Sequence, residues 1–384
     1  MPLPQESLDE LVAAVARFVK ERLVPIENET AENDKVPDSV IQTMKEMGLF
    51  GMSIPEEYGG LGLTMEEEVR VAFELGRTSP VFRSVLGTNN GIGSQGIIMF
   101  GTEAQKRRYL PGLASGEIIG SFALTEPEAG SDAGSVRMTA KKDGDHYVLN
   151  GTKRFITNAA KAGVFTTFAR TNPDIPGAKG MSAFLVPNGL AGIEIGKADK
   201  KMGQHGTTTS DVVFNDVRVD ADALLGGVEG QGFKAAMQVL DRGRLHISAV
   251  CVGVAERLIA DCVRYGSQRK QFGKPIVEFQ LIQAMLADSY AESYAAKSMV
   301  LETARDRDRG ADVSMNAAAC KMFASEMVGR VADKAVQIYG GAGYIADYGI
   351  ERFYRDVRLF RLYEGTTQIQ QIVIARALLR NAAG

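Results

Sequence analysis

The spacing of the apolar residues changes twice along this chain of 384 residues. Up to about residue 118 they recur at helical intervals, as Leu8, Leu11 and Val15 do. Short alternating runs separated by turn residues then follow, before the helical period returns and holds to the end. Because a helical pattern does not form a strand, we expect an α+β multidomain chain. The predicted domains are residues 1–118 (all helix), 119–226 (β) and 227–384 (helix).

Local signals refine this division. Ser7 and Glu10 have the spacing of a capping box at the start of the first helix. A turn at 143–145 predicts a β-hairpin. Long helical stretches cover 230–269, 278–310 and 311–341, and a helical pattern over 351–380 closes the chain. Long helices joined by short loops predict a four-helix bundle.

Charge and composition exclude several classes of protein. The formal net charge is −3 and the pI about 5.8, so no basic footprint for nucleic acid is present. No apolar run reaches the ~18 residues of a membrane span. The N-terminus lacks a secretory signal. Three unpaired cysteines fit a reducing compartment, and we expect a cytoplasmic protein.

No metal motif and no nucleotide motif in its usual context is present. No two of the three histidines have metal-ligand spacing, so we expect no metal site. The G-x-G-x-x-G at residues 91–96 lies in the helical part of the chain and not after a strand, and the P-loop pattern does not occur. Both observations argue against a Rossmann or P-loop nucleotide site.

Five short motifs offer chemistry, each with a plainer alternative. LTEPEAGSD (124–132) presents main-chain N–H groups and hydroxyls to an oxygen-rich ligand, or is only a turn. Phe155 in KRFITN stacks on a planar ring or lies in the core. In RKQFGKPIVEFQ (269–280) the guanidinium of Arg269 could bind a phosphate, or the segment could be a solvated connector between helices. QIYGGAG (337–343) caps a helix or lets a ligand approach the backbone. Glu364, in LYEGTTQIQ, is a catalytic base or a surface carboxylate.

Together, in this order and spacing, the five motifs resemble the acyl-CoA dehydrogenase family over essentially the whole chain. The resemblance implies an N-terminal helical domain, a middle β-barrel-like domain and a C-terminal four-helix bundle. It implies FAD as cofactor, in a cleft between the β domain and the bundle that reaches into a neighbouring subunit. A homotetramer, a dimer of dimers, follows from that sharing.

The resemblance also assigns cofactor contacts. Residues 122–131 would hold the isoalloxazine, and 155–157 would cover its other side. Pyrophosphate and adenine contacts would come from a partner subunit's 269–280 segment, and 337–341 would lie along the ADP half. The residues assigned to FAD are Phe122, Leu124, Thr125, Gly130, Ser131, Phe155, Ile156, Thr157, Arg269, Phe272, Gln280, Gln337, Gly340, Gly341, Thr366 and Gln368. Many relatives have tryptophan where this chain has Phe155.

Glu364 matches the family's catalytic base. It would remove the proton α to the thioester carbonyl while the flavin takes the β hydride, which yields a 2-enoyl-CoA. Burial would raise its pKa and make it a better base. One branch of the family carries the base on an earlier helix, where this chain has Gly243. Substrate contacts would come from Ser131, Asp241, Arg244, Tyr363 and Gly365.

Arg83 and Ser84 bear on the acyl group. Glutaryl-CoA dehydrogenases resemble this chain here, and their arginine-serine pair binds the distal carboxylate of the substrate. A neighbouring acid of those enzymes is replaced by Gly76, which argues against decarboxylation. Alternatively, Arg83 pairs with an internal acid such as Glu74 or faces solvent. The acyl group is therefore short, branched or dicarboxylic.

Two other functions fit the same fold. An acyl-CoA oxidase would pass electrons to oxygen, whereas the family expectation is electron-transfer flavoprotein and a role in fatty-acid or amino-acid catabolism. A non-catalytic flavin-bearing binding protein would need a basic C-terminal extension, but this chain stops at NAAG.

Overall fold

The computed structural model describes residues 2–175 and 177–383 of the chain. Its first part is helical, with α1 (Gln5–Phe18), α2 (Glu27–Glu32), α3 (Asp38–Glu46), α4 (Met65–Leu75), α5 (Pro80–Asn90), α6 (Gln95–Phe100) and α7 (Glu103–Ser115). The predicted capping box at Ser7 is wrong, because α1 already begins at Gln5 and no side chain caps it. Capping boxes are found instead at Thr64, before α4, and at Thr102, before α7.

The middle part is a seven-stranded sheet of β1 (Gly120–Ala123), β2 (Thr139–Asp143), β3 (His146–Thr157), β4 (Val164–Arg170), β5 (Met181–Pro187), β6 (Ile193–Ile195) and β7 (Thr209–Asp220). The predicted hairpin is present, since β2 and β3 pair antiparallel from Asp143–His146 outward. The strand order is β1-β4-β2-β3-β7-β6, with β5 on the other edge of β4. Phe165, Phe184 and Phe214 fill the interior of the sheet.

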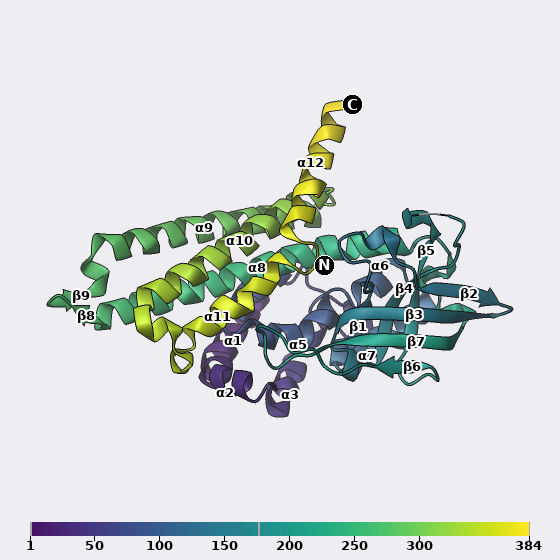
Figure 1. The fold of residues 1–384 in the computed structure, drawn as a ribbon, viewed down its shortest axis with the longest axis horizontal. Helices are drawn as coiled ribbons and strands as arrows, with labels where there is room; N and C mark the ends of the chain where they lie inside the picture. Colours follow the sequence, from purple (N-terminus) through teal and green to yellow (C-terminus); the bar gives the residue numbers. More distant parts are fainter. Residues whose placement is uncertain (1, 176, 384) are drawn as a thin grey trace.

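The third part is dominated by three long helices, α8 (Gly232–Gln268), α9 (Gln280–Asp308) and α10 (Ser314–Tyr339), which lie side by side (Figure 1). The short strands β8 (Lys270–Gln271) and β9 (Lys274–Pro275) form the turn at the far end of the bundle (Figure 1). The N-terminal helix α4 packs on α8 and α9, so the bundle core is shared between the first and third parts.

The closing segment is not one continuous helix. It consists of α11 (Ile350–Val357), a 3-10 turn over Arg358–Arg361 and α12 (Thr367–Ala383). Glu364 and Gly365 lie in the break between them and both have positive φ, at 54° and 91°. Helix α12 begins against α10 and projects away from the rest of the molecule (Figure 1).

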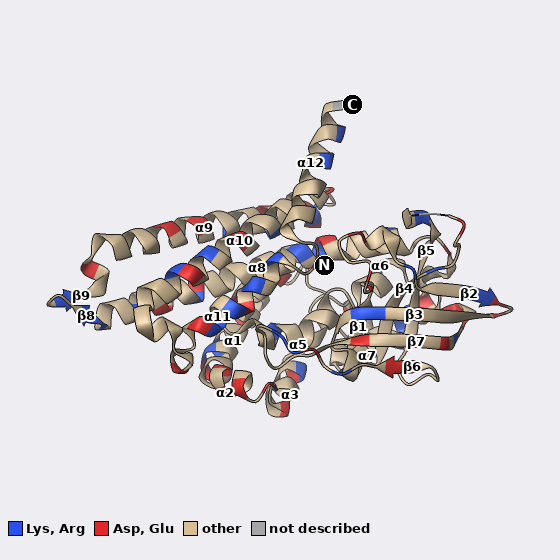
Figure 2. Ribbon diagram, in the orientation of Figure 1, with Lys and Arg blue, Asp and Glu red and all other residues tan. Residues whose placement is uncertain are grey.

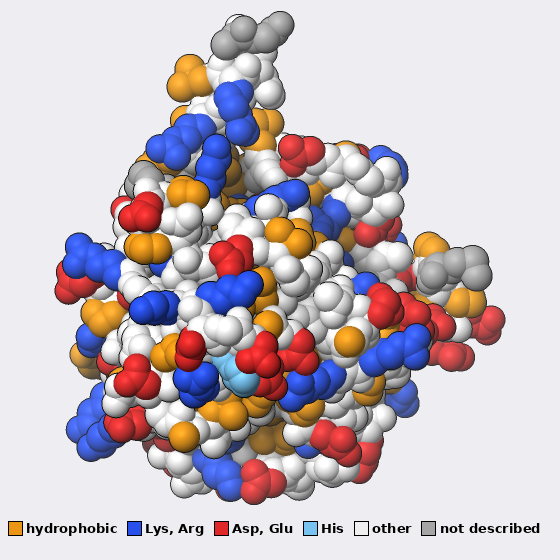
Figure 3. Space-filling view, turned by 90° about the vertical axis from the view of Figure 1, so that its right-hand side faces the viewer, with side chains coloured by type: hydrophobic (Ala, Val, Ile, Leu, Met, Phe, Trp, Pro, Cys, Tyr) orange, Lys and Arg blue, Asp and Glu red, His pale blue; other side chains and the backbone are white. Residues whose placement is uncertain are grey.

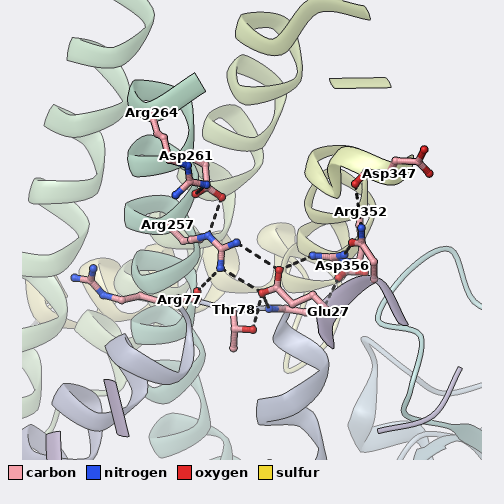
Figure 4. A network of polar contacts seen from close by, with 11 residues as sticks. Glu27, Arg77, Thr78, Arg257, Asp261, Arg264, Asp347, Arg352 and Asp356 are labelled. Atoms are coloured by element: carbon pink, nitrogen blue, oxygen red, sulfur yellow. Dashed lines mark hydrogen bonds and ion pairs between the residues drawn. The ribbon is translucent and has the colours of Figure 1, made fainter. Parts of the chain in front are cut away.

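Glu27 ties the N-terminal helices to the bundle (Figure 4). Its buried carboxylate accepts a hydrogen bond from Thr78 Oγ1 at 2.6 Å and pairs with Arg352 of α11 at 2.8 Å. Arg257 of α8 lies 3.4 Å from the same carboxylate and also binds Asp261. Three segments far apart in sequence therefore meet at one carboxylate, which fixes the first part of the chain on the third.

Charges of both signs are spread along the helices of the bundle (Figure 2). They are likewise interspersed over the face that carries the sheet (Figure 3). Among the described residues, no helix combines the length and the apolar character that crossing a bilayer requires. Our proposed domain boundaries, 118/119 and 226/227, fall in the connections between α7 and β1 and between β7 and α8.

Candidate active site

A cavity of about 670 Å³ lies where the sheet, α5, α8 and the break before α12 meet. It brings together most of the predicted site residues, from the first part of the chain to the last. Those that line it are Arg83, Ser84, Phe122, Leu124, Thr125, Gly130, Ser131, Phe155, Thr157, Arg244, Tyr363, Glu364 and Gly365.

Glu364 presents its carboxyl group to this cavity. Its Oε2 is buried and has no hydrogen-bond partner among the described residues. Burial raises the pKa of Glu364 above its ordinary value, and the positive charges of Arg83, Lys321 and Arg244 offset part of that rise. An unbonded carboxylate with a raised pKa, held in a left-handed conformation that side chains seldom adopt, is the arrangement expected of a general base.

Gly243 of α8 makes room for that carboxyl group. A Cβ built at Gly243 would overlap Glu364 Oε2. Position 243 therefore lies directly against the Glu364 carboxyl group, and a side chain there would displace that group from its present place.

Two buried side chains hold the break in place, and the sequence did not single them out. Lys321 of α10 is fully buried, and its Nζ donates to the main-chain oxygen of Gly365 at 2.6 Å. Gln370 donates to the same oxygen at 3.0 Å and to that of Glu364 at 3.1 Å. The sequence signal for a buried Lys321 was a single lysine within the apolar pattern NAAACKMFAS. This signal is ambiguous, because the aliphatic part of a lysine often lies along apolar surface while its ammonium group stays in water.

The opposite wall of the cavity has an exposed aromatic ring at a bulge in β3. Phe155 has a φ of 58°, and the pairing of β3 with β7 shifts register between Lys153 and Ile156. The bulge turns the Phe155 ring outward, where it is 57% exposed. This position suits stacking on a planar ring. The side chain of Ile156 points the other way, into the core of the sheet, so any contact that it makes with a cofactor would come from its main chain.

A buried ion pair supports the neighbouring loop. Lys153 Nζ donates to Leu124 O at 3.1 Å and pairs with Glu126 at 2.7 Å. The Glu126 carboxylate also accepts from the N–H groups of Arg137 and Met138. Burial lowers the pKa of Lys153 to about 8, with Glu126 acting in the opposite direction. Both residues lie in motifs that the sequence singled out, but the sequence did not predict that they pair. The pair fixes the loop that would receive the isoalloxazine.

The predicted pyrophosphate and adenine contacts lie elsewhere. Arg269, Phe272, Gln280, Gly340 and Gly341 line a second cavity, of about 1150 Å³, at the β8–β9 end of the bundle. This cavity shares no lining residue with the first. Among its lining residues, the ring of Phe272 is 93% exposed, and the rings of Tyr265 and Tyr339 stack with their centroids 4.0 Å apart. Within one chain, the two groups of predicted cofactor residues are therefore separate.

Four other predicted residues lie outside the lining of both cavities. Gln337 and Gln368 are exposed on α10 and α12, and Thr366 Oγ1 accepts from Ile369 N at the start of α12. Asp241 pairs with Arg244 at 2.6 Å and accepts from Ser314 Oγ, so it orients the arginine that does line the cavity.

Arg83 is buried, with 7% of its surface exposed, and has no ion-pair partner among the described residues. Its alternative partner Glu74 is bound to Arg77 instead, at 3.2 Å. The guanidinium folds back along α5 over Gly87, where an added Cβ would lie 2.6 Å from Arg83 Cζ. Ser84 Oγ donates to Gln204 Oε1 at 3.0 Å. Gly76 has no room for a side chain, since its Cβ would meet Val250 O at 2.5 Å.

The three parts of the fold correspond to the three domains of one known family. Family models match in the same order: acyl-CoA dehydrogenase N-terminal domain at residues 5–117, middle domain at 121–217 and C-terminal domain at 230–379. The chain belongs to the acyl-CoA dehydrogenase family.

Similar proteins cover nearly the whole chain. An acyl-CoA dehydrogenase of Bacillus subtilis is 40% identical over 95% of this chain and 96% of its own. An acryloyl-CoA reductase (NADH) of Anaerotignum propionicum is 43% identical over 97% of this chain and 94% of its own.

Solved structures agree. Butyryl-CoA dehydrogenase from Megasphaera elsdenii is 36% identical, with a TM-score of 0.94 over 99% of both chains. A glutaryl-CoA dehydrogenase in complex with glutaryl-CoA is 33% identical, with a TM-score of 0.91 over 99% of this chain and 96% of that one. An acyl-CoA dehydrogenase from Bacillus anthracis, solved with FAD, is 34% identical, with a TM-score of 0.92 over 99% of this chain and 68% of that one.

This is a family of FAD-dependent enzymes that dehydrogenate acyl-CoA. The residues on the cleft wall fit that cofactor. The exposed Phe155 ring offers a stacking surface, and the clamped loop after β1 presents its backbone to the cavity. At Gly130 an added Cβ would meet only Thr125 Cγ2, at 3.9 Å, so a ligand can approach the backbone there.

Proposed function

We propose that Glu364 is the base that removes the α proton of an acyl-CoA thioester. The observation that carries this role is its buried, unbonded Oε2 in the cleft, at a backbone conformation fixed from α10 and α12. A flavin bound in the cleft would supply the acceptor for the β hydride. Glu364 then holds the proton, and the product is a 2-enoyl-CoA. The N–H of Glu364 would polarise the thioester carbonyl, which makes the α proton more acidic.

The FAD of each site is shared between two chains in this proposal. Phe122, Leu124, Gly130, Phe155 and Thr157 line the cleft with Glu364 and would bind the isoalloxazine half. Arg269, Phe272, Gln280 and the glycines at 340–341 line the second cavity and would bind the pyrophosphate and adenine half of a partner's cofactor. A homotetramer built as a dimer of dimers would contain four such sites.

The acyl group that fits the cleft best carries an anionic end. Arg83 is a buried guanidinium with no ion-pair partner in the part of the chain that the structure describes, and such a charge is costly unless a ligand neutralises it. A terminal carboxylate would bind it with charge-assisted hydrogen bonds, and Ser84 lies beside it in the cavity lining. The similar glutaryl-CoA dehydrogenase supports the same class of substrate.

The test compares glutaryl-CoA with pentanoyl-CoA, which has the same chain length without the carboxylate. Anaerobic bleaching of the flavin is measured against thioester concentration. We expect glutaryl-CoA to act at lower concentration and Arg83→Ala to abolish the difference, a change of about 2–5 kcal/mol. Arg77→Ala is the matched control, because Arg77 is an arginine near the surface that pairs with Glu74 and Glu256.

Two results would contradict the proposal in different ways. An equal response to both thioesters, or a stronger response to pentanoyl-CoA, would make Arg83 structural and the substrate a plain short or branched acyl-CoA. Unchanged bleaching of the flavin in Glu364→Gln would contradict the role of Glu364 as the base, because loss of a general base should slow flavin reduction by about 10²- to 10⁴-fold.

A second candidate is the reverse reaction. The 43% identical acryloyl-CoA reductase favours it, and the same Glu364 would then donate the proton to the α carbon. Because the half-reaction between flavin and thioester is reversible, the electron donor distinguishes the directions, and steady-state reduction of an enoyl-CoA with NADH would favour the reductase. For the forward reaction, electron-transfer flavoprotein is our proposed acceptor, and rapid reoxidation by air would favour an oxidase instead.

A further inference from the structure

The turn that carries Glu364 is held from behind by α10. Lys321 Nζ lies 2.6 Å from Gly365 O, and Glu326, on the same helix, accepts from Thr367 Oγ1 at 2.7 Å and from Arg361 at 3.0 Å. The contacts thus reach residues on both sides of Glu364. One rigid helix therefore sets where the break begins and where α12 starts.

Lysine is an unusual residue for holding a turn through a single buried hydrogen bond. It is fully buried, and its one hydrogen bond among the described residues is to a main-chain oxygen. No carboxylate lies within ion-pair distance of its Nζ in the described part of the chain. A neutral side chain with an N–H donor would serve the hydrogen bond equally well, so the buried charge calls for a second explanation.

The charges around Lys321 supply that explanation. Glu364 lies on the break, Arg244 on α8 and Glu326 on α10, and the buried Cys251 faces the same space from α8. Burial lowers the pKa of Lys321 to about 8, and Glu364 opposes that change more than any other group. In turn, the charges that act on Glu364 are Arg83 from α5, Lys321 from α10 and Arg244 from α8.

We propose that Lys321 is a positioning residue for the catalytic base, with two separable effects. Its hydrogen bond to Gly365 O holds the left-handed turn that aims the Glu364 carboxylate at the substrate. Its positive charge stabilises the ionised form of that carboxylate, so that the base remains active toward lower pH. Lys321 is not among the residues that line the cavity, so it would act through the turn and not by contact with the substrate.

Lys321→Met tests both effects, because methionine keeps the apolar stem but has neither the donor nor the charge. We expect kcat for flavin reduction to fall roughly 100-fold, as for a base misplaced by about 1 Å, while KM for the thioester changes little. The acidic limb of the pH profile should move to higher pH, since removing a nearby positive charge raises the pKa of Glu364. A crystal structure of the variant would report φ at Glu364 independently of activity.

Gln370→Met separates the two effects and covers the case in which Lys321→Met does not fold. It removes the other donor to Gly365 O without changing any charge. We expect a lower kcat with the acidic limb unmoved. Lys153→Met is the matched buried lysine, which holds the cofactor loop rather than the base turn. Lys153→Met should weaken FAD retention and leave the acidic limb of the pH profile unchanged.

The inference rests on the proposed role of Glu364, and the variants tell the two apart. If Glu364→Gln keeps its rate, the proposed base is wrong. A different result would overturn only the role of Lys321. In that case Glu364→Gln is inactive, while folded, FAD-loaded Lys321→Met keeps both its kcat and the acidic limb of its pH profile. A normal kcat in both Gln370→Met and Lys321→Met would overturn the anchoring of the turn.

Discussion

Two glycines on α5 and α8 make room for the two side chains that we propose act on the substrate. Gly87 lies under the Arg83 guanidinium and Gly243 under the Glu364 carboxyl group. Each lies inside a helix, where glycine is less favourable than alanine by about 1 kcal/mol. The space that they leave is therefore maintained at some cost in helix stability.

Gly87→Ala is expected to reduce selectivity without unfolding the protein. The added methyl would lie 2.6 Å from Arg83 Cζ, so the guanidinium must move away. The response to glutaryl-CoA should weaken more than the response to pentanoyl-CoA in anaerobic titrations. Gly243→Ala is the matched control, because its methyl displaces the base and should slow both thioesters alike. An unchanged preference in Gly87→Ala would contradict the role of Arg83.

At the scale of single residues, the sequence singled out the proposed base, Glu364, but not the side chains that hold it. Glu364 was found through its motif, whereas Lys321, Lys153 and Gln370 act through contacts with residues at least 5 positions away and up to 44. Such contacts leave no local pattern. A buried lysine differs from a solvated one only in what surrounds it in the fold.

At the scale of elements, long regular helices were easier to predict than their ends. The apolar period of α8 to α10 repeats over many turns and identified all three. The break over 358–366 was missed, because its residues continue a helical pattern and side chains from α10 and α12 hold it open. The bulge at Phe155 was missed for a similar reason, since the register of β3 depends on its partner β7.

A buried acid on α4 should make the protein sensitive to acid. Glu68 binds His246 at 2.6 Å and pairs with Arg242, which joins α4 to α8. Burial alone would raise the pKa of Glu68, but Arg242 and His246 outweigh it and lower the pKa to about 2. A lowered pKa in the folded state contributes stability above the ordinary pKa, about 3 kcal/mol here, and this is lost as the pH falls from about 4.5 to about 2.

Urea unfolding followed between pH 7 and pH 2.5 measures this contribution. Glu68→Gln should lower the free energy of unfolding at pH 7 by about 3–5 kcal/mol, because it leaves Arg242 buried and unpaired. As the pH falls, the free energy of unfolding of Glu68→Gln should decrease less steeply than that of the parent protein. Glu57→Gln, at an exposed site, is the control and should follow the parent curve. Parallel curves for Glu68→Gln and the parent would exclude this source of acid lability.

At the scale of the whole molecule, one chain carries the two groups of predicted cofactor residues in separate cavities. The cleft with Glu364 is lined by residues of the sheet and the bundle, whereas Arg269 lines the second cavity and directly precedes β8. Strands β8 and β9 lie at the far end of the bundle (Figure 1). Helix α12 projects from the body, with Leu378 and Leu379 exposed along it. Both features suit a chain that is completed by a second copy, as the proposed shared site requires.

Mixing two inactive variants tests that sharing. Glu364→Gln lacks the base, and Arg269→Ala lacks the proposed pyrophosphate contact. In a mixed dimer, one of the two sites would combine an intact Glu364 with an intact Arg269. Co-expression should therefore restore about a quarter of the parent activity if the chains pair at random. Activity no greater than that of the separate variants would show that each chain completes its own site.

The separation of the two cavities has a consequence for inheritance. A cell with two differently damaged copies of the gene, one altered near the cleft and the other near the β8–β9 turn, would still assemble some working enzyme. Two copies damaged in the same cavity would not complement one another. Damage to one copy alone would inactivate half the sites in every mixed dimer, which is the same total loss as if the chains never mixed.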